Sequence, residues 1–371
     1  MQQGVVSRFP AIVSLLFVLG GIPGAVSGQG FGEGLPPGFP PPPVPEDNPL
    51  TAAKVALGRH LFFDTRLSAD GTFACSTCHQ PVHAFTDSRQ RAVGVTGEVH
   101  PRGTMALANV VYNASLNWAD PNLLRLEDQM AIPMFSVKPV EMGVSGHEAE
   151  VLARLIQEPR YGALFEAAFP EEEAPINLHN VILSIASFER TLISGSSPYD
   201  RYVYWDDSES LSPAARRGMR LFFSAELACS ECHSGFNFSG PIALAGQQAD
   251  PEFHNTALYS LDESGAYPQD NQGVFEHSET PGDMGRFRAP SLRNIAVTAP
   301  YMHDGSMPTL ETVIDHYAAG GRASENPLKS PLLTGFAITA DETHDLLRFL
   351  ESLTDRAFLE DPRFQNPWSS P

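Results

Sequence analysis

All four cysteines of the chain lie in two copies of one pattern, Cys-x-x-Cys-His. The first copy spans residues 75–79 and the second spans residues 229–233. Two thiols at this spacing can add to the two vinyl groups of a haem, and the histidine that follows can ligate the iron from one face. The pattern therefore predicts two covalently bound c-type haems, with His79 and His233 as proximal iron ligands. The residues that would attach the haems are Cys75, Cys78, Cys229 and Cys232.

Two other uses of paired cysteines explain the pattern less well. A structural zinc site would not require a histidine directly after each pair. A thioredoxin-like dithiol belongs to a βαβ unit, and the sequence around these motifs lacks one. Because every cysteine lies in a motif, none is left for a conventional disulfide.

The residues that precede each motif are also alike. Gly-Arg-His-Leu-Phe-Phe at 58–63 comes before the first motif, and Gly-Met-Arg-Leu-Phe-Phe at 218–223 comes before the second. Thr51 and Ser212 are suitable N-caps for two helices that contain these runs. The repeated order of elements predicts two homologous domains, each with one haem.

The N-terminus has the pattern of a secretory signal peptide. Arg8 is followed by an apolar run over residues 11–19 and then by small residues up to Gly28. This run is too short to span a bilayer, although an uncleaved anchor is an alternative to a cleaved signal. Export together with c-type haem predicts a periplasmic protein that has no membrane span once the signal is removed. The net charge of −20 argues against a nucleic-acid partner.

The predicted fold class is mainly α, with two cytochrome c-like domains and long loops. Residues 240–285 are one such loop, and the sequence contains no convincing strand. The predicted segments are a signal peptide at 1–28, an extended Pro- and Gly-rich leader without core residues at 29–49, and domains at 50–208 and 209–371. Helical spacing and caps predict further helices at 147–157, 177–193, 309–317 and from Thr339.

The group on the open side of each iron decides what a haem does. Two strong protein ligands suit electron transfer, whereas an open face can bind and cleave peroxide. The sequence offers no single obvious distal ligand. The candidates are His83, His100, several methionines and Tyr317.

Several runs beyond the haem motifs resemble those of the bacterial di-haem cytochrome c peroxidases and their relative MauG, which oxidises a partner protein. The resemblance extends from about residue 48 to about residue 354. Runs at 188–202 and 265–268 are similar to the MbnH-like enzymes of methanobactin and related copper systems, one of which oxidises a tryptophan of its partner. The markers of the wider family are Trp118, Leu126-Glu-Asp-Gln129, Pro139-Val-Glu-Met-Gly143, Arg288-Ala-Pro-Ser-Leu-Arg-Asn294, Thr298-Ala-Pro-Tyr-Met-His-Asp-Gly305 and Thr309-Leu-Glu.

The resemblance implies roles for three residues near the haems. Glu141 matches a carboxylate that takes a proton from bound peroxide and returns it to the leaving oxygen. Gln129 matches an amide of the distal pocket that can hydrogen-bond an oxygen on the iron. Trp118 matches an indole between the two haems that relays electrons or holes. The spacings between these three residues are slightly longer than the family pattern.

The resemblance also implies a calcium ion between the haems, and here the chain departs from the pattern. Thr298 and Pro300 match two carbonyl ligands, but Gly103 stands where the family has an asparagine ligand. In conventional peroxidases a histidine blocks the first haem until the enzyme is reduced, and Val95 stands at that position. We expect an open first haem, with His100 either a surface or pocket residue or a substitute for the blocking histidine.

Tyr317 lies at the inner end of the helix predicted at 309–317. Its spacing from the apolar residues of that helix places it on the same buried face. An ordinary core tyrosine would satisfy its hydroxyl locally. The resemblance instead implies a distal ligand on the second haem, which is Tyr in MauG and Met in electron-transferring peroxidases, and a phenolate stabilises higher oxidation states. The apolar residues are Leu310, Val313 and Ile314, and the rival ligands are Met302 and Met307.

The expected function is therefore that of a haem-dependent oxidoreductase. Hydrogen peroxide would react at the first haem, and a high-valent haem state would oxidise a residue, possibly Trp, of a partner protein. MauG has a surface tryptophan just before the second motif as its exit route, and Leu227 stands there instead. The alternatives are a peroxidase that takes electrons from a small cytochrome or cupredoxin, and a non-catalytic di-haem electron-transfer cytochrome.

Overall fold

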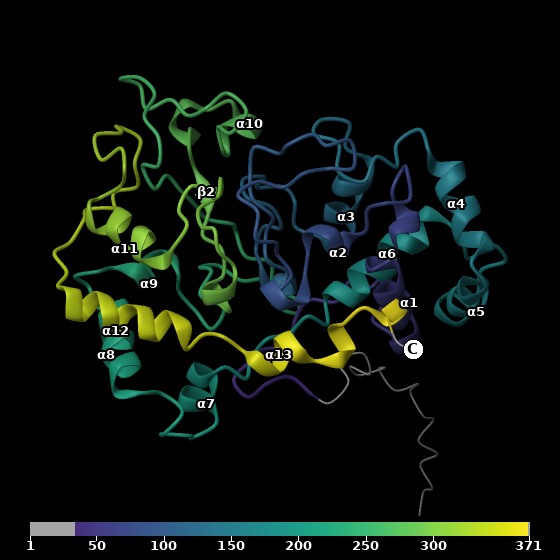
Figure 1. The fold of residues 1–371 in the computed structure, drawn as a ribbon, viewed down its shortest axis with the longest axis horizontal. Helices are drawn as coiled ribbons and strands as arrows, with labels where there is room; N and C mark the ends of the chain where they lie inside the picture. The colour runs from purple at the N-terminus through teal and green to yellow at the C-terminus, as the bar shows by residue number, and fades with distance from the viewer. Residues whose placement is uncertain (1–33, 370–371) are drawn as a thin grey trace, which may run out of the picture.

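The computed structural model of the protein describes residues 34–369 and is mainly helical (Figure 1). The predicted signal peptide at 1–28 lies outside the described residues. In the N-terminal half the α-helices are α1 (Ala52–Phe62), α2 (Cys75–Cys78), α3 (Leu126–Phe135), α4 (Glu148–Gln157), α5 (Pro159–Ala168) and α6 (Leu178–Glu189). In the C-terminal half they are α7 (Pro198–Tyr204), α8 (Pro213–Phe222), α9 (Cys229–Cys232), α10 (Phe275–Ser278), α11 (Leu310–Ala318), α12 (Ala340–Glu351) and α13 (Arg356–Glu360).

The N-terminal half is built around the crossing of α1 and α6. Thr51 caps α1 as predicted, and its side chain accepts a hydrogen bond from the Lys54 N–H. Gly58 lies where the two helices touch, because a Cβ there would come within 1.8 Å of the Ser184 carbonyl oxygen. The glycine therefore allows the helix backbones to approach closely, and the aromatic side chain of Phe62 is fully buried beside them.

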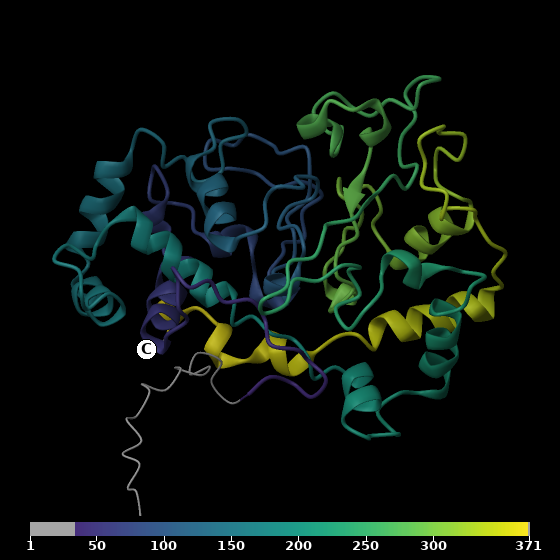
Figure 2. The same cartoon turned by 180° about the vertical axis from the view of Figure 1, so that it is seen from behind.

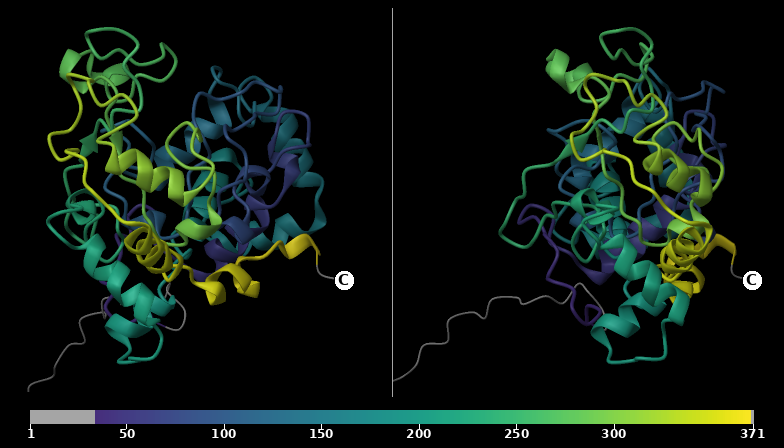
Figure 3. Two further views of the ribbon diagram at one scale, coloured as in Figure 1. Left: turned by 60° about the vertical axis from the view of Figure 1, so that its left-hand side comes forward. Right: turned by 90° about the vertical axis from the view of Figure 1, so that its left-hand side faces the viewer.

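The C-terminal half repeats this arrangement with α8 and α12, which lie against each other in Figure 3. Ser212 caps α8 as predicted. A Cβ at Gly218 would come within 1.9 Å of the Asp345 carbonyl oxygen, so this glycine has the same role as the one in α1. Asn109 and Asn294 occupy equivalent left-handed positions, with φ of 58° and 61°. The repeat in the sequence therefore corresponds to a repeat in the structure.

Most predicted helices are confirmed, with one difference in length. The helix predicted at 177–193 ends at Glu189 in α6. The chain turns there because Ser194 pairs with Asn109, whose side-chain oxygen accepts from the Ser194 N–H at 2.7 Å and whose amide donates to the Ser194 carbonyl at 2.9 Å. The helix predicted to begin at Thr309 is α11, and the predicted cap at Thr339 begins α12.

The predicted loop at 240–285 is mostly irregular but contributes to the core. It contains β1 (Phe253–His254), which pairs antiparallel with β2 (Phe287–Arg288). These two-residue strands form the one sheet within residues 34–369. Leu258 and Tyr267 from this segment are buried in a cluster with Phe287. The loop therefore packs beside the second motif instead of extending into solvent.

The expectation that the Pro-rich leader lacks core residues is wrong for residues 34–49. Phe39 is buried and its ring lies 4.6 Å from that of Phe236. The Tyr112 hydroxyl donates to the Pro40 carbonyl at 2.7 Å. Asn48 is fully buried and donates to the Glu127 carboxylate at 2.7 Å. Because residues 34–49 are extended, individual residues of this short segment contact both halves of the protein.

The C-terminal segment returns to the N-terminal half, where its last turn (Pro367–Ser369) lies against α1, as the yellow end of the chain shows in Figures 1 and 2. Phe358 and Phe364 are buried in the N-terminal cluster, and Trp368 donates to the His60 carbonyl at 2.9 Å. Asp355 caps α13 and its carboxylate accepts from the backbone N–H groups of Gly195 and Ser196. The leader at residues 34–49 and the C-terminal segment therefore both connect the two halves.

None of the helices between residues 34 and 369 is long and apolar enough to cross a membrane.

Candidate functional site

The two motif histidines have the same orientation. His79 Nδ1 lies 2.7 Å from the Phe85 carbonyl oxygen. His233 Nδ1 lies 3.1 Å from the carbonyl oxygens of Phe238 and Pro290. An Nδ1–H that donates to a carbonyl leaves Nε2 with a free lone pair, which is the arrangement of a metal-ligating histidine. Burial lowers the pKa of both imidazoles and keeps them neutral, as a metal ligand requires.

Left-handed residues place the accepting carbonyls. Ala84 and Phe85 have φ of 52° and 65°, and they turn the chain back after the first motif. Phe238 has φ of 52° at the corresponding place after the second motif. Such values are uncommon for residues other than glycine. Both motifs are therefore followed by a tight turn that orients the histidine.

No disulfide joins the four motif cysteines. Burial raises the pKa of Cys78 to about 12, and the pKa values of Cys229 and Cys232 to about 11. A zinc site would need thiolates in a cluster. Among residues 34–369 no group of three or more His, Cys, Asp or Glu side chains could hold a metal ion. Neutral thiols beside an oriented histidine fit covalent haem attachment better than zinc.

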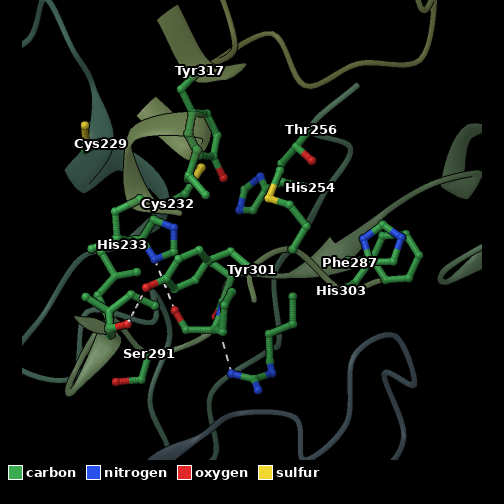
Figure 4. A pocket seen from close by; sticks show the side chains of 18 of the residues that line it. Cys229, Cys232, His233, His254, Thr256, Phe287, Ser291, Tyr301, His303 and Tyr317 are labelled. Carbon is green, nitrogen blue, oxygen red and sulfur yellow. Dashed lines mark hydrogen bonds between the residues drawn. The ribbon is translucent and has the colours of Figure 1, made fainter. Parts of the chain in front are cut away.

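A cavity of about 250 Å³ adjoins the second motif. Cys229, Cys232 and His233 line it from α9, and Tyr317 lines it from α11 (Figure 4). Figure 4 shows the Tyr317 hydroxyl pointing into the cavity that the His233 ring also faces. Burial raises the pKa of this phenol, so it ionises only where a positive charge such as a metal ion compensates. The arrangement suits a haem iron bound between His233 and Tyr317.

The Tyr317 hydroxyl has no hydrogen-bond partner among the described residues. Other buried tyrosines have one, since Tyr112 donates to a carbonyl, Tyr161 to Asp64 and Tyr267 to Asn255. A core tyrosine with a locally satisfied hydroxyl is therefore not what the structure shows at position 317. Of the two rival methionines, Met302 lines the same cavity, whereas Met307 is buried in a neighbouring cluster.

Arg288 is a cation that the sequence reasoning left without a role. It is 6% exposed and lines the cavity, and burial lowers its pKa to about 10. Its guanidinium donates only to the carbonyls of Asn117 and Ala289, both at 3.3 Å, and no carboxylate among the described residues pairs with it. A buried unpaired charge is costly. The carboxylate groups of a haem would neutralise it, so the cavity suits haem in charge.

Trp118 lies in the wall of the same cavity. Its indole N–H donates to the Gly103 carbonyl at 2.9 Å, and its ring centroid is 6.5 Å from that of His303. The cavity wall also includes Thr86 and Asp87, which follow the first motif. Trp118 thus shares a cavity wall with residues that follow the first motif and with the second motif, and its place between the haems and its role as a relay stay predictions.

The two predicted calcium ligands lie on one cavity, but Gly103, at the position of the third ligand, has no side-chain oxygen. Thr298 and Pro300 line the cavity that Gly103 also lines. The Gly103 N–H donates to the His303 carbonyl at 2.9 Å, and its own carbonyl accepts from Trp118. The calcium site therefore stays a prediction.

Glu141 is held on the side of the first motif by backbone hydrogen bonds to α3 and to a neighbouring loop. The Met142 N–H donates to the Pro133 carbonyl of α3 at 2.9 Å. The Val95 N–H donates to the Glu141 carbonyl at 2.8 Å. Val95, which occupies the position of the blocking histidine, therefore helps to hold the Glu141 backbone through its own N–H group.

The Glu141 carboxyl has the pKa of a group that can both accept and donate a proton near neutrality. Its side chain is 38% exposed, and the burial of the remainder raises the pKa of the carboxyl to about 7. The pKa of Cys78 is raised mainly by burial, next by the Asp87 carboxylate and then by the Glu141 carboxylate. Glu141 therefore lies near the first motif. Gln129 lies on α3, and its side-chain oxygen is buried without a partner among the described residues. The structure thus brings Glu141 and α3 together.

The two candidate histidines near the first motif have different environments. His100 is only 12% exposed, so it is not a surface residue, and its Nδ1 is 4.0 Å from a Glu141 carboxylate oxygen. His83 Nδ1 lies 3.1 Å from the Val297 carbonyl, which engages it between the two halves. Sequence reasoning had no signal for either contact, because both join distant segments.

Known proteins resemble this chain over most of its length. The profile described as "Di-haem cytochrome c peroxidase" matches residues 52–208, and the profile "RoxA-like, cytochrome c-like" matches residues 286–318. "Methylamine utilization protein MauG" of Methylorubrum extorquens is 37% identical over 311 residues, which cover 84% of this chain and 81% of the relative. "Cytochrome c551 peroxidase" of Pseudomonas aeruginosa is 30% identical over 333 residues, which cover 88% and 86%.

One solved structure is especially similar. It is described as "a MauG-like protein associated with microbial copper homeostasis", has a TM-score of 0.87 and is 44% identical, with 90% of this chain and 98% of that chain covered. The predicted fold of cytochrome c-like domains is thereby confirmed. The chain belongs to the di-haem cytochrome c peroxidase and MauG family, and it is a haem-dependent oxidoreductase of that type.

Proposed function

We propose that the protein binds two c-type haems covalently, reacts with hydrogen peroxide at the first, and oxidises a residue of a partner protein. The haems would be attached through the four motif cysteines, with His79 and His233 as proximal ligands. When bound, they would supply iron that reacts with peroxide and stores two oxidising equivalents. The chain's own residues bind and orient the peroxide and move its protons.

Glu141 carries the proton transfer. Its carboxylate accepts one proton from peroxide and returns it to the leaving oxygen, which departs as water. A pKa of about 7 suits both steps at neutral pH. Gln129, with its unpartnered side-chain oxygen, is the amide that orients the peroxide from α3.

The observation that carries the proposal is the Tyr317 hydroxyl in the cavity beside the second motif. It faces the space beside His233 and has no other partner among the described residues. A phenolate ligand favours the higher oxidation states of iron, so the second site would hold an oxidising equivalent. Trp118, in the wall of the same cavity, would connect the two sites.

A peroxidase with a small electron donor is the second candidate, and one observation favours it. Met302 lines the cavity beside the second motif, and a methionine ligand would favour reduced iron and electron delivery. The family also includes relatives named as peroxidases of cytochromes. This reading requires Met302 to be the iron ligand in place of Tyr317.

The partner is proposed to be an exported protein with an oxidisable aromatic residue such as tryptophan. The support is the similarity to a MauG-like protein associated with copper homeostasis, together with the signal-like N-terminus. We place the reaction in the periplasm. Leu227, just before the second motif, is buried in the C-terminal cluster. Oxidising equivalents would therefore leave by a route other than a surface tryptophan at this position.

Steady-state turnover with an added donor tests the proposal. The haem-loaded protein is mixed with peroxide and a reduced small cytochrome or cupredoxin, and donor oxidation is followed. Slow donor oxidation by the wild type and faster oxidation by Tyr317→Met would agree with a protein-oxidising enzyme. Rapid donor turnover by the wild type that Met302→Leu abolishes would overturn it in favour of the peroxidase.

A further inference from the structure

A second titratable group lies beside Glu141. His100 Nδ1 is 4.0 Å from Glu141 Oε1, and the His100 side chain is 12% exposed. This separation exceeds a hydrogen bond, but hydrogen bonds of catalytic groups are often long without substrate and tighten when it binds. The imidazole is therefore within reach of the carboxylate.

The backbone of His100 is fixed by a hairpin at residues 92–100. Val93 and Val99 form an antiparallel bridge, and the His100 N–H donates to the Ala92 carbonyl at 2.8 Å. His100 thus occupies the last position of a short ladder.

The same hairpin holds the loop that carries Glu141. At its tip the Val95 N–H donates to the Glu141 carbonyl at 2.8 Å, and the Glu98 carboxylate accepts from the Val140 N–H at 2.9 Å. Gly94 touches this loop so closely that a Cβ there would lie 1.7 Å from the Val140 carbonyl oxygen. The hairpin and the loop form one packed unit. The fold therefore fixes the backbone of His100 close to the loop that carries Glu141.

Burial, and not a neighbouring charge, keeps His100 neutral. Burial lowers its pKa, and Glu98 opposes this effect more weakly. The Nε2 atom is buried without a partner in the described part of the chain. A neutral ring with its proton on Nδ1 would donate to Glu141 and leave an acceptor on the buried side. The other titratable groups that face the pair are Cys75 and Cys78 from α2.

We propose that His100 is a positioning residue, whose Nδ1–H orients the Glu141 carboxylate toward hydrogen peroxide. The inference rests on the proposed function. Reduction of one peroxide to two waters consumes two protons and two electrons. The electrons come from the protein substrate through the two haems, and Glu141 handles the protons. His100 holds that carboxylate and neither gains nor loses an atom over the cycle.

The test compares His100→Leu, His100→Asn and a matched control, His147→Leu. His147 forms an exposed pair with Glu150 at 2.9 Å, far from the motifs in sequence. In each haem-loaded protein the peroxide rate is measured against pH, and the resting ferric absorption spectrum is recorded. An asparagine amide can replace Nδ1–H as a donor, whereas leucine cannot.

We expect His100→Leu to react about 10-fold more slowly with peroxide at pH 7, with its pH midpoint moved upward. The midpoint rises because a carboxylate that loses a hydrogen-bond donor is harder to ionise. His100→Asn should recover most of the rate, His147→Leu should match the wild type, and all resting spectra should agree.

Three results would overturn the inference. An unchanged rate and midpoint in His100→Leu, with a reactive wild type, would remove His100 from the mechanism and leave the proposed function standing. A resting spectrum that changes from low spin to high spin in His100→Leu would identify His100 as an iron ligand that blocks the first haem. A wild type that does not react with peroxide would refute the proposed function and this inference together.

Discussion

Replacement of Glu141 by Gln removes the carboxyl group that we propose transfers protons at the first motif. The amide keeps the size of the side chain but cannot accept a proton from peroxide. General acid–base catalysis contributes about 10²- to 10⁴-fold to a rate, so Glu141→Gln should slow the peroxide reaction by about that factor. The assay is stopped-flow mixing of the haem-loaded ferric protein with peroxide.

The wild-type rate should also depend on pH in a defined direction. The reactive form of Glu141 is the carboxylate, and its pKa is about 7. The ionised fraction is about one-tenth at pH 6 and about nine-tenths at pH 8, so the rate should rise roughly 10-fold over this range. Glu141→Gln should lose this dependence.

Glu150→Gln is the matched control, because Glu150 is 70% exposed and pairs only with His147. It should leave both the rate and the pH profile unchanged. The reasoning is refuted if Glu141→Gln reacts within about twofold of the wild type, or if the wild-type rate is flat between pH 6 and pH 8.

Four further predictions concern the second site and the fold. Tyr317→Phe removes the phenol oxygen and should abolish any long-lived oxidised state after peroxide addition, which absorption spectra would show. Gly58→Ala forces a Cβ against a carbonyl of α6 and should lower the free energy of unfolding by about 1–3 kcal/mol in denaturant titrations. Gly162→Ala meets no neighbouring atom, so it should stabilise by about 0.5–1 kcal/mol in the same titrations. Asp200→Ala leaves the fully buried Arg293 guanidinium without its carboxylate and should cost about 3–5 kcal/mol in unfolding free energy.

Local signals in the sequence predicted the helices well. Thr51, Ser212 and Thr339 each begin a helix where a cap was predicted, because a side-chain oxygen that accepts a backbone N–H is a short-range interaction. The end of the helix predicted to reach residue 193 depended on a pairing with Asn109, which is distant in sequence. Its early end at Glu189 was therefore not predictable from spacing.

The close grouping of the two cysteines and the histidine in each motif was also predictable, because the spacing of the motif fixes it. Contacts between loops were not. The approach of His100 to Glu141 joins two irregular segments, and no periodic pattern records it. Arg288 was part of a recognised run, but only burial without a carboxylate shows why a cation there needs an anionic ligand. Phe39 was hidden in a Pro-rich leader whose composition indicates no core.

The most direct test of the central claim is one spectrum. Hydrogen peroxide is added to the purified di-ferric protein without any reductant, and the absorption spectrum is followed over time. The account predicts an oxidised state two equivalents above the ferric protein that persists until a partner protein or reductant is added. An immediate return to the ferric spectrum with no such state, or no reaction at all, would contradict it.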